Sequence, residues 1–136
     1  MNRKIQAEVM KNPIVWSCDW DSDEAEVYLS DGIMVKRMPA AECMVDLSRL
    51  KKVDYIKYFQ DDEYWPEVKP TKLRLKDVGY TAVCLEGEGQ KCWINEKYFK
   101  MFKKYFFEYN GGNWAQVRHP ETVEIIAVIA VIRTNE

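Results

Sequence analysis

The sequence lacks the short motifs by which common enzymes are recognised. It contains no G-x-x-x-x-G-K-[ST] phosphate loop, no G-x-G-x-x-G dinucleotide fingerprint, no G-x-S-x-G nucleophile turn and no H-E-x-x-H zinc helix. His119 is the only histidine of the chain, and it precedes Pro120 in what we expect to be a surface turn. General acid–base chemistry would depend on carboxylates or on this one imidazole. We therefore expect a protein that is not an enzyme and that binds no cofactor.

Long apolar runs are also missing. The longest, residues 125–132, has eight residues, whereas a membrane-spanning helix needs roughly 18–20. Residues 1–10 are polar and mixed, without the apolar segment of a secretory signal. We expect no membrane partner and a cytoplasmic location.

Cysteine is sparse and widely spaced. Cys18, Cys43, Cys84 and Cys92 include no pair with the tight C-x₂₋₄-C spacing that zinc sites use. Free thiols are the expectation in a reducing compartment. Residues 80–85 and 91–94 are expected to form a hairpin, and a three-residue loop at 87–89 would place Cys84 opposite Cys92.

Three aspartates resemble the start of a calcium loop without completing it. Asp19, Asp21 and Asp23 have the spacing of its first ligands, but such a loop needs glycine at its sixth position and glutamate at its twelfth. Glu24 and Ser30 occupy those positions here. We expect no metal site, and an acidic hairpin tip in its place.

Strand-like alternation dominates what is present. Of the 136 residues, 47% are hydrophobic and 13% aromatic, which suits a single packed domain spanning residues 1–136. Apolar positions repeat with period two in most segments, and Asp31-Gly32 favours a hairpin. The predicted fold class is α+β: a mostly antiparallel sheet of about six to eight strands with two helical segments packed on it. The expected strands are residues 14–20, 25–30, 33–38, 72–76, 80–85, 91–94, 114–118 and 123–132, and the expected helices are residues 40–59 and 95–109, the second capped by Asn95.

Acidic and aromatic side chains favour a protein partner. Residues 1–65 carry 9 basic and 13 acidic side chains, and exposed tryptophan and tyrosine are frequent interface anchors. The favoured interpretation is a small non-enzymatic protein-binding module. A solvated hairpin tip, and aromatics that plug the ends of the core, would explain the same residues without a partner. The candidate partner-binding residues are Asp19, Trp20, Asp21, Asp23, Glu24 and Glu26 in the acidic hairpin, and Tyr64 and Trp65 before Pro66.

Basic side chains support an alternative, a nucleic-acid-binding protein. Residues 66–136 carry 11 basic and 9 acidic side chains, and positive groups beside aromatic ones can follow a phosphate backbone. Without such a partner, the same lysines solvate the outside of an aromatic helix, and the net charge of −2 counts against nucleic acid. The candidate residues form a basic helix and strand face: Lys72, Arg74, Lys76, Lys97, Lys100, Lys103 and Lys104.

Two further hypotheses concern biological context. Small domains of this kind are frequent in bacteriophages and mobile elements, so a phage accessory or inhibitor protein that acts on a host protein is one hypothesis. A structural subunit of a phage or other assembly is another, because residues 123–132 could complete a sheet across subunits. The chain is expected to be a monomer or a homodimer.

Overall fold

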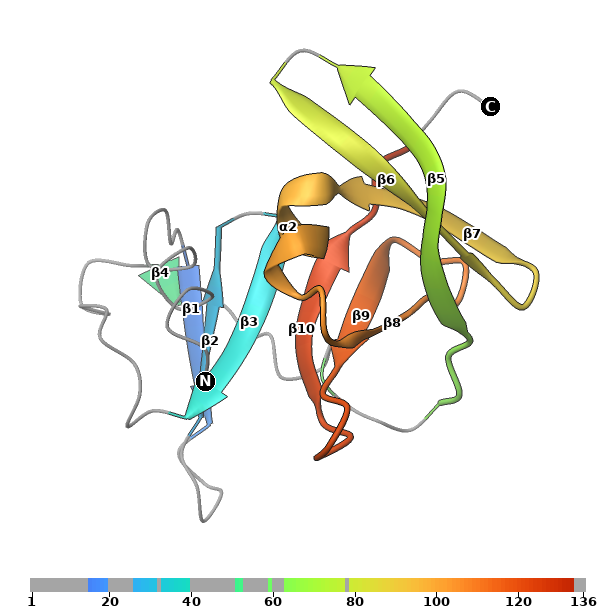
Figure 1. The fold of residues 1–136 in the computed structure, drawn as a ribbon. Coiled ribbons are helices and arrows are strands. Elements are labelled where there is room, and N and C mark those ends of the chain that lie inside the picture. Colours follow the sequence, from blue (N-terminus) through green and yellow to red (C-terminus); the bar gives the residue numbers. More distant parts are fainter. Residues whose placement is uncertain are drawn as a thin grey trace. The chain divides into compact units, whose positions relative to one another are not determined.

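A computed structural model describes residues 15–19, 26–31, 33–39, 51–52, 59, 63–77 and 79–133 of the chain. The chain divides into two compact units, Met1–Gln60 and Asp61–Glu136. Strands make up most of the described residues in both units (Figure 1). No helix in this part of the chain combines the length and apolar character that crossing a bilayer requires.

The first unit contains a strand meander. β1, β2 and β3 pair antiparallel in succession, and β4 runs parallel to β1. Asp31 holds the turn between β2 and β3, because its Oδ1 accepts the backbone N–H groups of Ile33 (3.0 Å) and Met34 (2.9 Å). The meander predicted from alternation and from this turn is confirmed. The described strands of the unit are β1 (Val15–Asp19), β2 (Glu26–Ser30), β3 (Met34–Pro39) and β4 (Lys51–Lys52).

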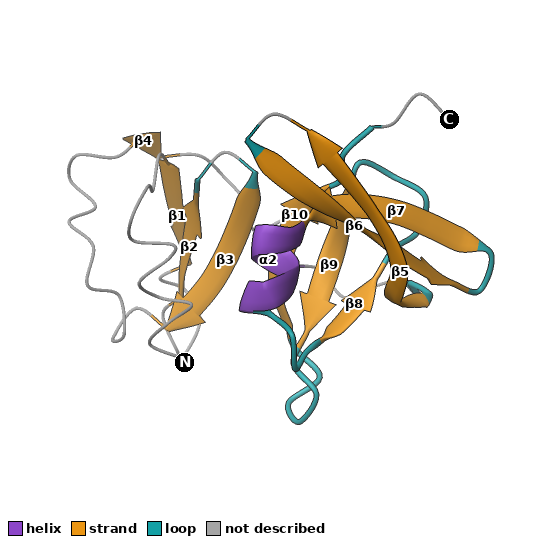
Figure 2. Cartoon of the chain, turned by 45° about the horizontal axis from the view of Figure 1, so that its top comes forward, coloured by secondary structure: helices purple, strands orange, loops and turns teal. Residues whose placement is uncertain are grey.

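The second unit is a curved antiparallel sheet with a short helix against it (Figure 2). Its strand order is β10-β9-β8-β5-β6-β7, and α2 packs on β6 and β7. The backbone N–H of Ile132 donates to the carbonyl oxygen of Trp93 in β7 at 2.7 Å, so the two ends of this strand order meet. The elements are β5 (Glu67–Asp77), β6 (Tyr80–Gly87), β7 (Gln90–Asn95), α2 (Glu96–Met101), β8 (Phe106–Glu108), β9 (Trp114–Arg118) and β10 (Ile125–Ala130).

The predicted α+β class with two helical segments is wrong, because the described chain is mostly antiparallel sheet with one short helix. α2 begins as expected, with Asn95 Oδ1 accepting the N–H of Lys97 at 2.9 Å, but it ends at Met101. Phe106–Glu108 is strand, where Phe106 is exposed and Phe107 is buried, as the pleat of a strand requires. Lys51–Lys52 is also strand, within the helix predicted for residues 40–59; apart from Phe59, the rest of that segment lies outside the described residues.

The β6–β7 hairpin has a different register from the predicted one. Its turn contains two residues, Glu88 and Gly89, both with positive φ (46° and 78°), as in a type I′ turn. Cys84 therefore pairs with Trp93, and Leu85 pairs with Cys92. Because neighbouring positions on a strand point to opposite faces, the two cysteines lie on opposite faces of the hairpin. Both are buried free thiols, and the predicted opposition of Cys84 and Cys92 is wrong.

Candidate functional site

Strand β5 carries one side of the candidate site. Glu67 and Val68 pair with β8, whereas residues 69–77 pair with β6 alone, and a bulge lies between Pro70 and Arg74. From Lys72 to Asp77, the side chains on both faces of the strand are exposed, including 51% of Leu73. This part of β5 is therefore an accessible edge with alternating basic and apolar side chains.

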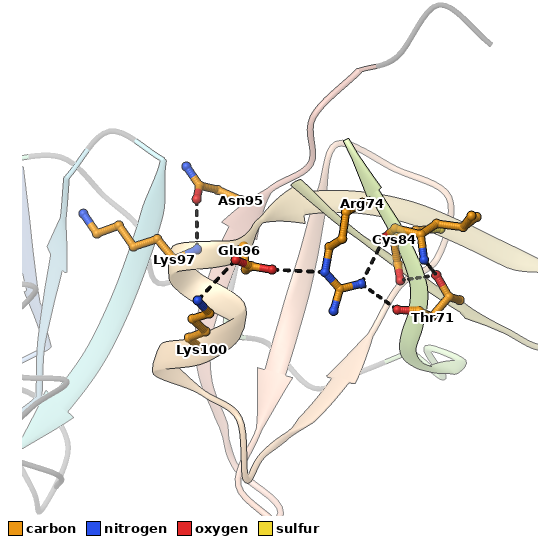
Figure 3. A network of polar contacts seen from close by, with 8 residues as sticks. Thr71, Arg74, Cys84, Asn95, Glu96, Lys97 and Lys100 are labelled. Atoms are coloured by element: carbon orange, nitrogen blue, oxygen red, sulfur yellow. Dashed lines mark hydrogen bonds and ion pairs between the residues drawn. The ribbon is translucent and has the colours of Figure 1, made fainter. Parts of the chain in front are cut away.

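Hydrogen bonds within the chain occupy the backbone of the bulge (Figure 3). Thr71 Oγ1 donates to the carbonyl oxygen of Cys84 at 3.1 Å and accepts the N–H of Leu73 at 3.2 Å. Arg74 Nη1 donates to the carbonyl oxygens of Thr71 (2.6 Å) and Leu73 (3.0 Å). The bulge is thus fixed in one shape, and Pro70 contributes no N–H there.

Glu96 ties β5 to helix α2. Its carboxylate accepts from Arg74 Nε at 3.0 Å and pairs with Lys100 Nζ at 3.3 Å, one helical turn later (Figure 3). The hydrogen bond from Lys100 has the largest effect and lowers the pKa of Glu96. Desolvation opposes it, and the hydrogen bond from Arg74 lowers the pKa further, so the net shift is downward. Glu96 therefore stays ionised at neutral pH and holds the basic strand beside the basic helix.

An open groove of about 290 Å³ lies where β5, α2 and β8 come together. Its aromatic part includes Phe106, which is 43% exposed, and Phe107, which is buried with its ring 5.6 Å from that of Phe99. Exposed lysines from β5 and from the turn after α2 surround these rings. The groove therefore combines a rigid aromatic wall with positive charge. The lining residues are Glu67, Val68, Lys69, Pro70, Phe99, Lys103, Lys104, Tyr105, Phe106 and Phe107.

Positively charged residues are concentrated in two segments that contribute to this groove. Residues 67–76 and 96–104 contain eight lysines and arginines and only two glutamates, and one of these, Glu96, is already paired. Lys69, Lys103 and Lys104 form no ion pair with another described residue. We name these eight side chains the cationic face: Lys69, Lys72, Arg74, Lys76, Lys97, Lys100, Lys103 and Lys104.

Of the predicted basic face, only Lys103 and Lys104 line the groove. The other five predicted residues lie on β5 and α2 outside its lining: Lys72, Arg74, Lys76, Lys97 and Lys100. Lys103 and Lys104 lie in the turn after α2 and not on a helical stripe. Sequence reasoning missed Lys69 and Phe106. The run Lys103-Lys104-Tyr105-Phe106, with cations beside aromatics, was the available indication of a groove wall.

The predicted acidic hairpin lies largely outside the described residues. This holds for Trp20, Asp21, Asp23 and Glu24, and for the side chain of Asp19. Glu26 is described, and its carboxylate pairs with Arg37 on the neighbouring strand, with Oε1 at 3.0 Å from Nη2. Its side chain is only 19% exposed, so this carboxylate is engaged within the sheet.

The predicted aromatic pair differs in exposure. Tyr64 is 77% exposed, and its hydroxyl donates to Glu88 Oε2 at 2.8 Å. This hydrogen bond to a carboxylate is the largest of the effects that raise the pKa of Tyr64. Trp65 is half-buried. Tyr64 therefore offers an accessible ring next to the β6–β7 turn.

His119 and Cys92 carry the imidazole and thiol groups that catalytic sites often use. His119 Nδ1 accepts the N–H groups of Glu121 (3.0 Å) and Thr122 (3.2 Å), and so holds the turn between β9 and β10. Burial, and to a lesser degree the proximity of Cys84, raise the pKa of the Cys92 thiol to about 12, which disfavours the reactive thiolate. Among the described residues, no three His, Cys, Asp or Glu side chains are grouped to hold a metal ion.

Comparison of the chain with protein-family models, with curated proteins and with solved structures gives no match.

Proposed function

We propose that this chain is a small non-enzymatic nucleic-acid-binding protein and that the cationic face is its binding surface. The observation that carries the proposal is the groove, in which Lys69 of β5 meets Lys103 and Lys104 beside accessible aromatic rings. Lysines in this arrangement neutralise phosphates and release their counterions, while aromatic side chains provide stacking surfaces for bases.

The distribution of charge supports the same conclusion. The overall charge of −2 arises because residues 1–65 carry a balance of −4, whereas residues 66–136 carry +2. A partner responds to the field near the surface it approaches, since charges beyond about 8–10 Å are screened at physiological ionic strength. The local excess of cations around the groove therefore matters more than the net charge of the chain.

The second candidate is a protein-binding module, including an inhibitor of a host protein. Its support is the exposure of Tyr64, an aromatic residue of the type that anchors protein interfaces, and of Leu73 and Leu75 on β5 (51% and 40%). In this case the cationic face would contact an acidic protein surface.

A salt titration tests the first candidate. The affinity for a fluorescent oligonucleotide is measured by anisotropy over a series of salt concentrations, for the natural chain and for Lys103→Gln/Lys104→Gln. We expect the slope of log K against log[salt] to become shallower by about 0.7 for each phosphate of a single strand that the variant no longer neutralises.

The matched control removes the same charge elsewhere in the second unit. Lys91 and Arg133 are exposed and do not line the groove, so Lys91→Gln/Arg133→Gln should leave the slope almost unchanged. Absence of binding at low salt, or equal effects of the two double variants, would refute the proposal.

A further inference from the structure

We propose that the groove selects single-stranded nucleic acid, with one base stacked on the ring of Phe106 while Lys69, Lys103 and Lys104 hold the flanking phosphates. This inference rests on the proposed function and specifies its ligand.

The pleat of strand β8 directs the side chain of Phe106 toward solvent. Phe107 is 3% exposed and packs inward, so the alternation of a strand directs its neighbour Phe106 outward, where 43% of the residue is accessible. β8 is held between β5 and β9, since Phe107 pairs with Val68 on one side and with Val117 on the other. The exposed ring therefore stands on a fixed backbone and loses little conformational freedom when a ligand stacks on it.

The aromatic residues on either side of Phe106 in the groove are also restrained. The ring of Tyr105 lies 5.7 Å from that of Phe102 and 5.4 Å from that of His119, while Phe99 packs on Phe107. Phe102 is fully buried. These contacts make the aromatic wall a preformed surface rather than a set of mobile side chains.

A stacked base requires an unpaired strand. In a duplex the faces of the bases are covered by their neighbours, so Phe106 would meet only backbone or groove edges. A single strand can turn a base onto an aromatic side chain and keep its phosphates near lysines, and this mode tolerates any base sequence. A groove volume of about 290 Å³ is near the lower end of ligand pockets, which suits a small planar group and not a duplex.

An acidic peptide suits this groove less well than single-stranded nucleic acid does. An extended peptide binds an exposed strand through main-chain hydrogen bonds. Pro70, which lines the groove, has no N–H, and the N–H of Leu73 donates to Thr71 Oγ1. The carbonyl oxygens of Thr71 and Leu73 already accept from Arg74. This stretch of β5 is thus protected against strand addition, as edge strands often are.

The test compares three probes of equal length, about 12 nucleotides: an oligothymidine, an oligomer with abasic sites in place of its bases, and a duplex. The proteins are the natural chain, Phe106→Ala, Phe106→Trp and the control Leu73→Ala, which removes another exposed apolar side chain outside the groove lining. Circular dichroism verifies that each variant folds.

We expect the natural chain to bind oligothymidine more tightly than either other probe. Phe106→Ala should weaken oligothymidine binding about 5- to 100-fold, the range typical of removing one base stack, and leave abasic binding unchanged. Phe106→Trp should retain affinity, and Leu73→Ala should match the natural chain.

Other outcomes separate the two proposals. Equal affinity for all three probes, or an unchanged affinity of Phe106→Ala for oligothymidine, would overturn the single-strand inference and leave the electrostatic function standing. Failure to bind any of the probes at low salt would overturn both. Tighter binding of an Asp- and Phe-containing peptide than of oligothymidine would assign the groove to a protein partner and overturn both as well.

Discussion

Arg74 and Glu96 join the basic end of β5 to the first turn of α2 through a contact of 3.0 Å, and Lys100 binds the second oxygen of the same carboxylate. The carboxylate of Glu96 thus contacts two cations of the proposed binding surface, Arg74 and Lys100. This arrangement makes Glu96 an informative position, because it stabilises the fold while reducing the local positive charge.

Replacing Glu96 with glutamine should therefore have opposite effects on stability and on binding. We predict that Glu96→Gln lowers the thermal midpoint and tightens oligonucleotide binding by roughly 2- to 5-fold, the scale of one surface charge interaction. A Glu96→Gln variant with a lower thermal midpoint in calorimetry and also a weaker oligonucleotide affinity in anisotropy would contradict this prediction.

The effect on stability should depend on pH in a defined direction. The pKa of Glu96 is lowered in the folded protein, so its contribution is present above the unfolded value of about 4.3 and disappears as the pH falls through the folded value. The difference in midpoint between the natural chain and Glu96→Gln should be constant near neutrality and should shrink below about pH 4. A difference that grows on acidification would show that the ion pairs are not its source.

Gly87, at the end of β6, is predicted to tolerate no side chain. A Cβ atom there would lie 2.2 Å from the backbone carbonyl oxygen of Glu67, at the point where β5 turns from β8 toward β6. Gly87→Ala should lower the free energy of unfolding by about 2–3 kcal/mol or more in urea titrations, because backbone must move. Gly112→Ala is the control, since its Cβ meets only the flexible side chain of Asn110 at 3.1 Å, and it should cost less than about 0.5 kcal/mol.

The ion pair between Glu108 and Arg118 is a second stabilising contact, apart from the cationic face. Arg118 Nη2 lies 3.0 Å from Glu108 Oε1, Gln116 donates to the same oxygen at 2.7 Å, and the two charged side chains are 15% and 13% exposed. Arg118→Gln should cost about 3 kcal/mol, because it leaves a largely buried carboxylate without its cation. The double variant Glu108→Gln/Arg118→Gln should recover part of this loss, and strictly additive losses in a double-mutant cycle would argue against direct coupling.

The thiols of Cys84 and Cys92 should stay separate and unreactive in the folded protein. They lie on opposite faces of the β6–β7 hairpin, and the pKa of Cys92 is raised to about 12. Mass spectrometry of protein treated with iodoacetamide at about pH 8, where an ordinary thiol of pKa ~8.5 reacts, should show these two sites labelled only after denaturation. A disulfide between them after mild oxidation, with the fold retained, would contradict the observed register.

The parts of this structure that were predictable from sequence depend on local chemistry. The Asp31 turn and the Asn95 cap are each made by a side chain and the backbone within three residues, so the sequence alone indicates them. The end of α2 was not predictable in this way. Phe106 and Phe107 continue a helical pattern as readily as a strand, and pairing with β5 and β9 decides between the two.

The binding surface was predictable only in part for the same reason. Lysines at 103 and 104 stand out in the sequence, but their meeting with Lys69 depends on a contact between segments more than thirty residues apart. The error in the β6–β7 register has a smaller cause. A turn of two residues differs from one of three by a single position. This shift in register places Cys84 and Cys92 on opposite faces of the hairpin.

Photochemical cross-linking tests the central claim most directly. An oligonucleotide that contains 5-iodouracil is bound to the natural chain, irradiated, and the adducts are mapped by mass spectrometry. The proposed function predicts adducts within the groove lining, with Tyr105 and Phe106 as the main sites and Phe106→Ala reducing their yield. Adducts confined to Tyr64, Trp65 or residues 1–60, with none in the groove, would contradict the claim that the cationic face is the nucleic-acid-binding surface.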